Sequence, residues 1–156
     1  IEVLLTFPLN EEEIIIGKYL SSVVIMVLTI LLMFPYAVTI LFLSKPDTGH
    51  IIGTYLSMIM TSISFLSIGL FASTLSSSQI TAFIVGFGLC FIFYLVGKIT
   101  FFLPVSIQGI FSYLGIDSHV SNMSRGVIDL KDIIYYLSIA VLFIYFSIEK
   151  LKMLRR

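Results

Sequence analysis

Charged residues are scarce in this sequence, and their scarcity indicates the class of protein. Of the 156 residues, 12% are charged and 58% are hydrophobic, whereas a soluble domain usually carries about 25% charged residues. So little charge cannot cover a folded chain in water, and the mean hydropathy of +1.10 indicates a membrane protein. The formal net charge is zero, so we expect no nucleic-acid partner and no acidic tail.

Residues that carry chemistry are scarce as well. The single cysteine, Cys90, lies in an apolar run, which excludes a disulfide framework and a cysteine-based metal cluster. The chain has two histidines, His50 and His119, and lacks the GxxxxGK(S/T) phosphate loop. We therefore expect no enzyme activity, no cofactor and no metal. Energy for any uphill transport would have to come from another subunit.

The beginning of the chain shows no short basic-then-apolar leader, so no signal peptide is predicted. Because the first residue is Ile1 rather than methionine, we expect this sequence to be a piece of a longer chain. It contains no internal repeat and no low-complexity stretch, and we interpret 1–156 as a single transmembrane domain.

Stretches without charge predict the membrane-spanning elements. A helix needs about 20 residues to cross about 30 Å of hydrocarbon. The stretch 19–44 suits one span, and 48–97 suits two with a break at the polar residues 76–79. The stretch 133–148 is shorter, and it spans if the lysines beyond it reach the interface. Open strands cannot satisfy their polar groups in lipid, so we predict an all-α polytopic bundle. The predicted spans are 18–44, 50–75, 79–103 and 131–151.

The regions outside the spans predict two further features. Residues 1–16 are predicted to form an interfacial helix, interrupted at Pro8 and followed by Asn10 as the N-cap of the first span. Residues 104–130 are predicted to form an external re-entrant segment and loop. Their apolar first part, 105–116, is too short to span, and the polar part, 117–130, is placed at the surface.

The uncharged stretches contain no Asp, Glu or Arg, and Lys18 and Lys98 fall only near span ends. Ion coupling usually needs an ionisable residue inside the bundle, so we expect none. The small polar residues Thr54, Ser57, Thr61 and Ser64 share one helix face. They would line a substrate path or, as the favoured interpretation, pack helices together.

Several single residues leave alternatives open. Pro35 would kink the first span for gating, although a tolerated bend is favoured. Lys98 would meet an anionic substrate, although reaching the interface is favoured. Tyr135 and Tyr136 fit an interfacial aromatic belt. The charged residues around His119 would form a site, although a solvated loop is favoured.

The order of several motifs resembles the ABC-2 type permeases. The similarity begins with Glu2, Leu4, Leu5 and Pro8, and continues with Gly17 and Lys18. Further motifs are Pro35-Tyr36, 69–73 and Ser78-Gln79, followed by His119, 124–130, Asp132 and Tyr135. The last group is most similar to the bacterial branch that contains the gliding-motility permease and the permease of nitrous-oxide-reductase maturation.

This resemblance implies a six-span permease of which the present chain would be the C-terminal four-span portion, in the bacterial inner membrane. A cytoplasmic ABC ATPase would bind the interfacial coupling helix, and a second permease half would complete a homodimer or heterodimer. The implied ATPase-coupling residues are Glu2, Leu4, Leu5, Pro8, Gly17 and Lys18. The implied external loop motif comprises His119, Ser124, Arg125, Gly126, Asp129 and Asp132.

The sequence thus predicts the permease subunit of an ATP-driven exporter. The basic C-terminal end, with Lys150, Lys152, Arg155 and Arg156, favours a cytoplasmic location for both ends of the chain. A scaffolding membrane protein without transport activity is the alternative function. An intramembrane enzyme, dependent on His119 or Arg125, is a third.

Overall fold

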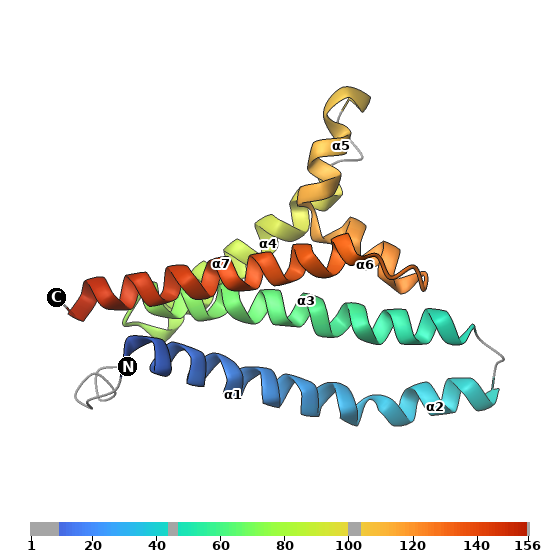
Figure 1. The fold of residues 1–156 in the computed structure, drawn as a ribbon, viewed down its shortest axis with the longest axis horizontal. Helices are drawn as coiled ribbons and strands as arrows, with labels where there is room; N and C mark the ends of the chain where they lie inside the picture. The colour runs from blue at the N-terminus through green and yellow to red at the C-terminus, as the bar shows by residue number, and fades with distance from the viewer. Residues whose placement is uncertain (1–9, 44–46, 100–103, 156) are drawn as a thin grey trace.

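The computed structural model describes residues 10–43, 47–99 and 104–155, and these residues form helices joined by short connections. Figure 1 shows α3 between α7 on one side and the α1–α2 pair on the other, with α5 projecting away from the bundle. The helices are α1 (Glu11–Leu32), α2 (Phe34–Leu43), α3 (Thr48–Leu75), α4 (Gln79–Ile99), α5 (Val105–Leu114), α6 (Ile116–Ser124) and α7 (Leu130–Arg155).

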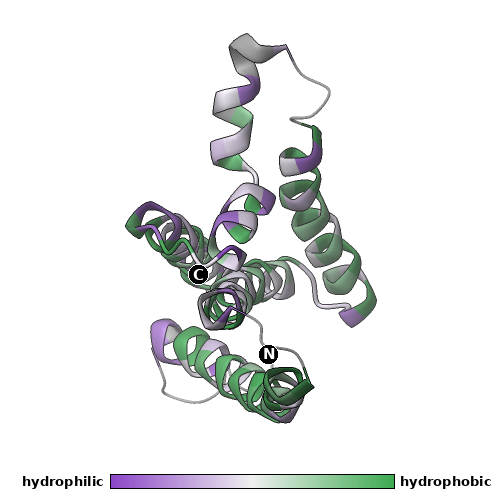
Figure 2. Cartoon of the chain, turned by 90° about the vertical axis from the view of Figure 1, so that its right-hand side faces the viewer, coloured by the Kyte–Doolittle hydropathy of each residue, from purple (hydrophilic) through white to green (hydrophobic). Residues whose placement is uncertain are grey.

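Four stretches are long and apolar enough to cross a membrane, which confirms the predicted all-α bundle with four transmembrane helices. Figure 2 shows α4 and the α1–α2 pair coloured mostly as hydrophobic, whereas hydrophilic residues gather in α6 and at helix ends. The turn at 76–78 separates the second stretch from the third, as the polar residues there predicted. The four stretches are Glu12–Leu43, Thr48–Leu75, Gln79–Ile99 and Leu130–Leu154.

Pro35 interrupts the first span. Helix α1 ends at Leu32, and α2 begins at Phe34 after a turn at Met33. A proline has no N–H and its ring meets the carbonyl one turn earlier, so the helical hydrogen bonds break at this point. The Met33 carbonyl at the break accepts from the Tyr36 backbone N–H at 3.1 Å and also from the Tyr55 hydroxyl of α3 at 2.9 Å.

Small polar residues pack α3 tightly against α7, as the favoured interpretation of that face predicted. Ser57, Ser64 and Ser67 are buried. The Ser64 hydroxyl donates to the Tyr136 carbonyl of α7 at 3.0 Å. On the neighbouring helix, a Cβ built on Gly86 would lie 3.2 Å from the Cβ of Ala72, so small residues bring α4 close to α3.

Two expectations about the end of the bundle that contains α6 were wrong. The polar stretch 117–130 is not a solvated loop, because α6 occupies its first half and buries His119. The bundle is also not free of ionisable side chains, because Asp132 in the first turn of α7 is completely buried. The turn before α7 lets α6 fold back over α3 and α7 and bury these side chains. The polarity of the local sequence does not indicate that another helix will cover them.

Two further boundaries and positions differ from the predictions. Gly17 and Lys18 lie inside α1, which runs without interruption from Glu11. Residues 11–16 therefore belong to the helix of the first span and not to a separate interfacial helix. Tyr136 does not belong to an interfacial belt, because its side chain is completely buried between α3, α6 and α7. An aromatic ring near a span end is buried wherever another helix covers it.

Candidate functional site

The end of the bundle where α1 begins and α7 ends contains the first candidate site, and we call it the inner end after the predicted topology. Asn10 precedes α1, and its backbone N–H donates to the Glu13 carboxylate at 3.1 Å. This contact satisfies one of the N–H groups left free at a helix start. The negative side chains in this first turn face the positive end of the helix dipole. Local sequence therefore fixes where α1 starts.

Contacts with two other helices hold this start of α1 in place. Ile15 packs with Leu70 of α3 and Leu151 of α7 in one buried apolar cluster. Lys152 of α7 approaches the Glu12 carboxylate at 3.2 Å, which brings the two ends of the described chain to the same side of the bundle. We call this group of contacts the inner clamp.

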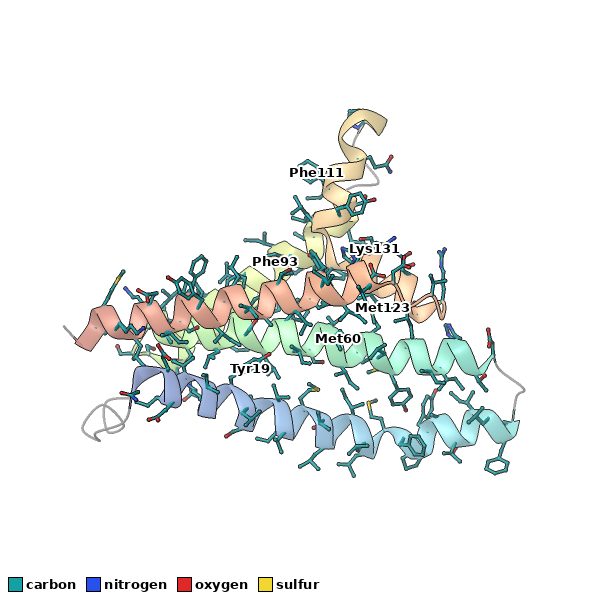
Figure 3. All side chains as sticks on the ribbon, in the orientation of Figure 1. Tyr19, Met60, Phe93, Phe111, Met123 and Lys131 are labelled. Carbon is teal, nitrogen blue, oxygen red and sulfur yellow. The ribbon has the colours of Figure 1, made fainter. Side chains whose placement is uncertain are left out.

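Two hydrogen bonds from the next turn of α1 extend the inner clamp. The Lys18 ammonium donates to the Ser73 hydroxyl of α3 at 2.9 Å. The Tyr19 hydroxyl donates to the Ile63 carbonyl of α3 at 2.9 Å, and Tyr19 lies between α1 and α3 in Figure 3. Helix α1 is therefore attached to α3 over several turns on its inner side.

An open cavity of about 630 Å³ adjoins the inner clamp. Its lining residues include the exposed carboxylates of Glu12 and Glu13. Gly17, predicted as a coupling residue, also lines it, and Lys18 follows in the chain. The other predicted coupling residues, Glu2, Leu4, Leu5 and Pro8, lie outside the described residues.

The opposite end of the bundle, which we call the outer end after the same predicted topology, contains the second candidate site, built around His119 of α6 and Asp132 of α7. The distance from His119 Nδ1 to Asp132 Oδ1 is 2.6 Å, and the side chains are 6% and 0% exposed. The other ring nitrogen, Nε2, lies 3.0 Å from the Tyr113 carbonyl of α5. One side chain thereby connects three helices.

Aromatic rings enclose the His119 imidazole. The Tyr135 ring stacks on it with a centroid separation of 4.0 Å, and the Tyr136 ring meets it edge-on at 6.1 Å. The Tyr135 hydroxyl donates to the Leu114 carbonyl at the end of α5. The tyrosines therefore exclude water from one side of the imidazole and also attach α5 to α7.

The remaining residues of the predicted external motif lie around the turn between α6 and α7 and do not join the His119–Asp132 pair. Arg125 is exposed, and its backbone N–H donates to the Asn122 carbonyl at 3.2 Å. Ser124 donates to the Ser121 carbonyl at 3.1 Å within α6. Asp129 pairs with Lys131 at 2.7 Å. The structure thus brings together two of the six predicted residues.

Glycines let the outer helices approach the bundle closely. Gly126, the sixth residue of the motif, has a φ of +82°, which side chains rarely adopt. A Cβ on Gly115 would lie 2.3 Å from the Gly97 Cα, and one on Gly53 would lie 2.0 Å from the Met123 carbonyl oxygen. Helices α5 and α6, which we call the cap, are therefore seated on the backbones of α3 and α4.

The sequence analysis did not identify the ion pair between Lys98 and Asp117. The Lys98 ammonium lies 2.8 Å from an Asp117 carboxylate oxygen, and the two side chains are 50% and 37% exposed. Lys98 therefore does more than reach the interface, because it joins the end of α4 to α6. The only sign of this pair in the sequence was that Lys98 and Asp117 stand at the two ends of the uncharged stretch 99–116.

Among the described residues, the outer site does not gather enough ligands to hold a metal ion. Both nitrogens of His119 already have partners, and the described residues contain no group of three or more His, Cys, Asp or Glu side chains suited to a metal ion. What the arrangement offers chemically is a buried proton-sharing pair that fixes the relative position of α5, α6 and α7.

Comparison with known proteins adds one finding to this geometry. Residues 1–148 match the sequence model of the family described as ABC-2 family transporter protein. Neither the curated proteins nor the solved structures include a match. The match covers the inner clamp residues of α1 and α3, the cap and most of α7.

Proposed function

The chain belongs to the ABC-2 transporter family, and we propose that it is the permease subunit of an exporter driven by a separate cytoplasmic ATPase. Membership and the four apolar helices make it a multi-pass membrane protein and a transmembrane component of the ABC-2 transporter family. The ATPase partner, a second permease half, export as the direction and the bacterial inner membrane as the location belong to the proposal.

The inner clamp is the observation that carries this proposal. A force applied by a partner to the segment before Asn10 would reach α1 directly, since α1 begins at Glu11. The cluster of Ile15, Leu70 and Leu151 would pass the displacement to α3 and α7, because close-packed interiors transmit strain. The chain itself lacks a phosphate loop, which supports a separate source of energy.

The surface around the cavity at the start of α1 supports a docked partner on this side. Glu12 and Glu13 are exposed there, and charged rims of this kind steer association with complementary surfaces. By the resemblance noted from the sequence, Leu4, Leu5 and Pro8 would belong to the coupling segment that binds the ATPase, and Leu4 and Leu5 would supply its apolar contacts.

A second permease half is supported by the apolar surface of α4. Phe83, Phe87 and Phe91 stack in a ladder along this helix, with centroid separations of 6.3 and 5.8 Å, and all three rings are exposed. We propose that a second half covers part of this apolar surface in the working exporter.

Co-purification and coupling measurements test the proposal. An ABC ATPase encoded beside the gene should remain bound to the tagged permease in mild detergent. Leu5→Asp and Pro8→Ala should each leave membrane insertion intact and uncouple transport from ATP hydrolysis. Met153→Asp is the matched control, because it adds a charge to an exposed position on α7 near the same end.

The outcomes separate the two candidate functions. Retention of the ATPase with loss of coupling only in the Leu5 and Pro8 variants supports the permease. If no ATPase is retained and no cargo moves, the exporter proposal is wrong and a scaffolding role is favoured. An activity of the isolated chain that disappears in His119→Ala would favour an intramembrane enzyme.

A further inference from the structure

The His119–Asp132 pair is the part of the outer end that the proposed function leaves unexplained. The cap is held on the bundle partly by apolar contacts of Ile116 and Met123 with Tyr136. Met60 of α3 packs against the same cluster, and Figure 3 labels Met60 and Met123. Apolar contacts are non-directional, so the directional links between the cap and α7 are the His119–Asp132 pair and the hydrogen bond from the Tyr135 hydroxyl to the Leu114 carbonyl.

The number of protons shared by the pair follows from its partners. The Tyr113 carbonyl oxygen only accepts hydrogen bonds, so His119 Nε2 must carry a proton and donate at 3.0 Å. At 2.6 Å, one proton lies between His119 Nδ1 and Asp132 Oδ1. Whichever atom holds it, the pair is neutral as a whole, and it needs no further charged partner.

The burial of the pair favours a role in positioning over a role in stability. Asp132 Oδ2 is buried without a hydrogen-bond partner, and a buried polar atom without a partner destabilises the arrangement that contains it. Buried pairs of this kind give less stability than apolar residues of similar size, whereas they can specify one geometry. Separation of α6 from α7 would give water access to both side chains and satisfy Oδ2.

A series of contacts connects this pair to the inner clamp. Tyr19 of α1 donates to the Ile63 carbonyl, and the next residue of α3, Ser64, donates to the Tyr136 carbonyl. Tyr136 follows Asp132 by one turn of α7 and contacts the His119 ring. Movement of α1 relative to α3 therefore acts on the helix that carries Asp132.

We propose that the His119–Asp132 pair is a latch that holds the cap closed against α7, and that transport requires this latch to open. The structure shows the closed state, in which the pair is buried and Asp132 Oδ2 has no hydrogen-bond partner. In the open state, α5 and α6 move away from α7 and the pair is hydrated. His119 and Asp132 are thus positioning residues, and their role in transport rests on the proposed function.

Hydrogen exchange of the purified chain in lipid nanodiscs tests the latch without any partner. Asp132→Leu removes the link, so amides of 105–124 should exchange about tenfold faster or more. Asp132→Asn should retain most of the protection. Its amide N–H can donate to Nδ1 while Nε2 remains on the Tyr113 carbonyl. Amides within 57–67 and 136–147 report whether each variant keeps its fold.

Asp117→Asn is the matched control, because it breaks an exposed ion pair between α4 and the same helix α6. Exposed pairs contribute little, so exchange of 105–124 should change less than about twofold. Faster exchange confined to Asp132→Leu, with retention in Asp132→Asn, supports the latch. The latch is overturned if wild type and Asp132→Leu exchange at the same rate. It is also overturned if Asp132→Asn loses as much protection from exchange as Asp132→Leu does.

The role in transport is tested separately with the assembled exporter. Asp132→Leu should bind the ATPase as wild type does, while cargo moved per ATP hydrolysed falls at least about fivefold. Asp132→Asn should restore most of the coupling. Unchanged coupling in Asp132→Leu overturns the role of the latch in transport. Failure of the wild-type chain to bind any ATPase contradicts the proposed function instead, and the exchange measurements do not depend on it.

Discussion

Replacement of Gly53 by alanine provides the sharpest test of how the cap is seated. Gly53 lies in α3 beneath α6, where a Cβ would be 2.0 Å from the Met123 carbonyl oxygen and 3.1 Å from the Gly126 Cα. Both of these neighbours are backbone atoms. No rotation of a side chain relieves the overlap, so a helix must move.

The size of the effect follows from these distances. Ordinary contact begins at 3.4 Å, so the Met123 carbonyl has to move by about 1.4 Å from its present 2.0 Å. Overpacking a well-packed site costs about 1–3 kcal/mol, and a clash with backbone belongs at the upper end. A loss of about 3 kcal/mol lowers the Tm by about 6–12 °C for a chain of this size.

Gly69→Ala is the matched control, because Gly69 lies in the same helix and a Cβ there meets nothing within 4 Å. Alanine is the better helix former, so this variant should be as stable as wild type or more stable, by up to about 1 kcal/mol. Thermal unfolding of both variants in the same detergent gives the comparison. The double variant Gly53→Ala with Met123→Ala should show no rescue, since the overlap involves the Met123 carbonyl.

The reasoning is refuted if Gly53→Ala and Gly69→Ala unfold at the same temperature. It is also refuted if Met123→Ala restores the stability of Gly53→Ala, because the overlap would then involve the side chain. Hydrogen exchange offers a second measurement. In Gly53→Ala, protection should fall mainly in α6, which has to move away from α3.

Three further substitutions have expected outcomes in the same unfolding assay. Gly126→Ala should cost about 1–2 kcal/mol, because an alanine is strained at a φ of +82°; an unchanged Tm would contradict this backbone conformation. Asp117→Asn should cost less than about 1 kcal/mol, because its pair with Lys98 is exposed; a larger loss would mean that the pair is buried in the membrane. Ser64→Ala should cost about 1 kcal/mol, because the Tyr136 carbonyl loses a buried donor; a gain in stability would argue against that hydrogen bond.

The sequence by itself was sufficient for the spans and their breaks. Uncharged stretches long enough to cross hydrocarbon must form helices there, because lipid offers no partners for backbone polar groups. Asn10 and Glu13 marked the start of α1 through contacts between residues three apart. Pro35 marked the place where the first span bends, because proline lacks the N–H that a helix needs, although the break into α1 and α2 was not predicted. Each of these features depends on residues close together in the chain.

The external motif shows the limits of the same reasoning. The resemblance named six motif residues as one group, but the structure pairs only His119 with Asp132. Arg125 and Asp129 remain at the turn. Polarity in a sequence does not tell whether another helix will cover a residue. His119 was therefore interpreted as solvated, although residues of α5 and α7 contact its ring and it is buried.

The tertiary structure alone decided which residues meet across long separations in the chain. Lys152 reaches Glu12 because α7 returns beside α1. Asp132 is buried because α6 folds back over the first turn of α7. These contacts depend on how whole helices pack, and helix packing follows from glycine positions and side-chain shapes on several elements together. Hydrophobicity along the chain determined that the helices enter the membrane, and their packing decided which polar groups they enclose.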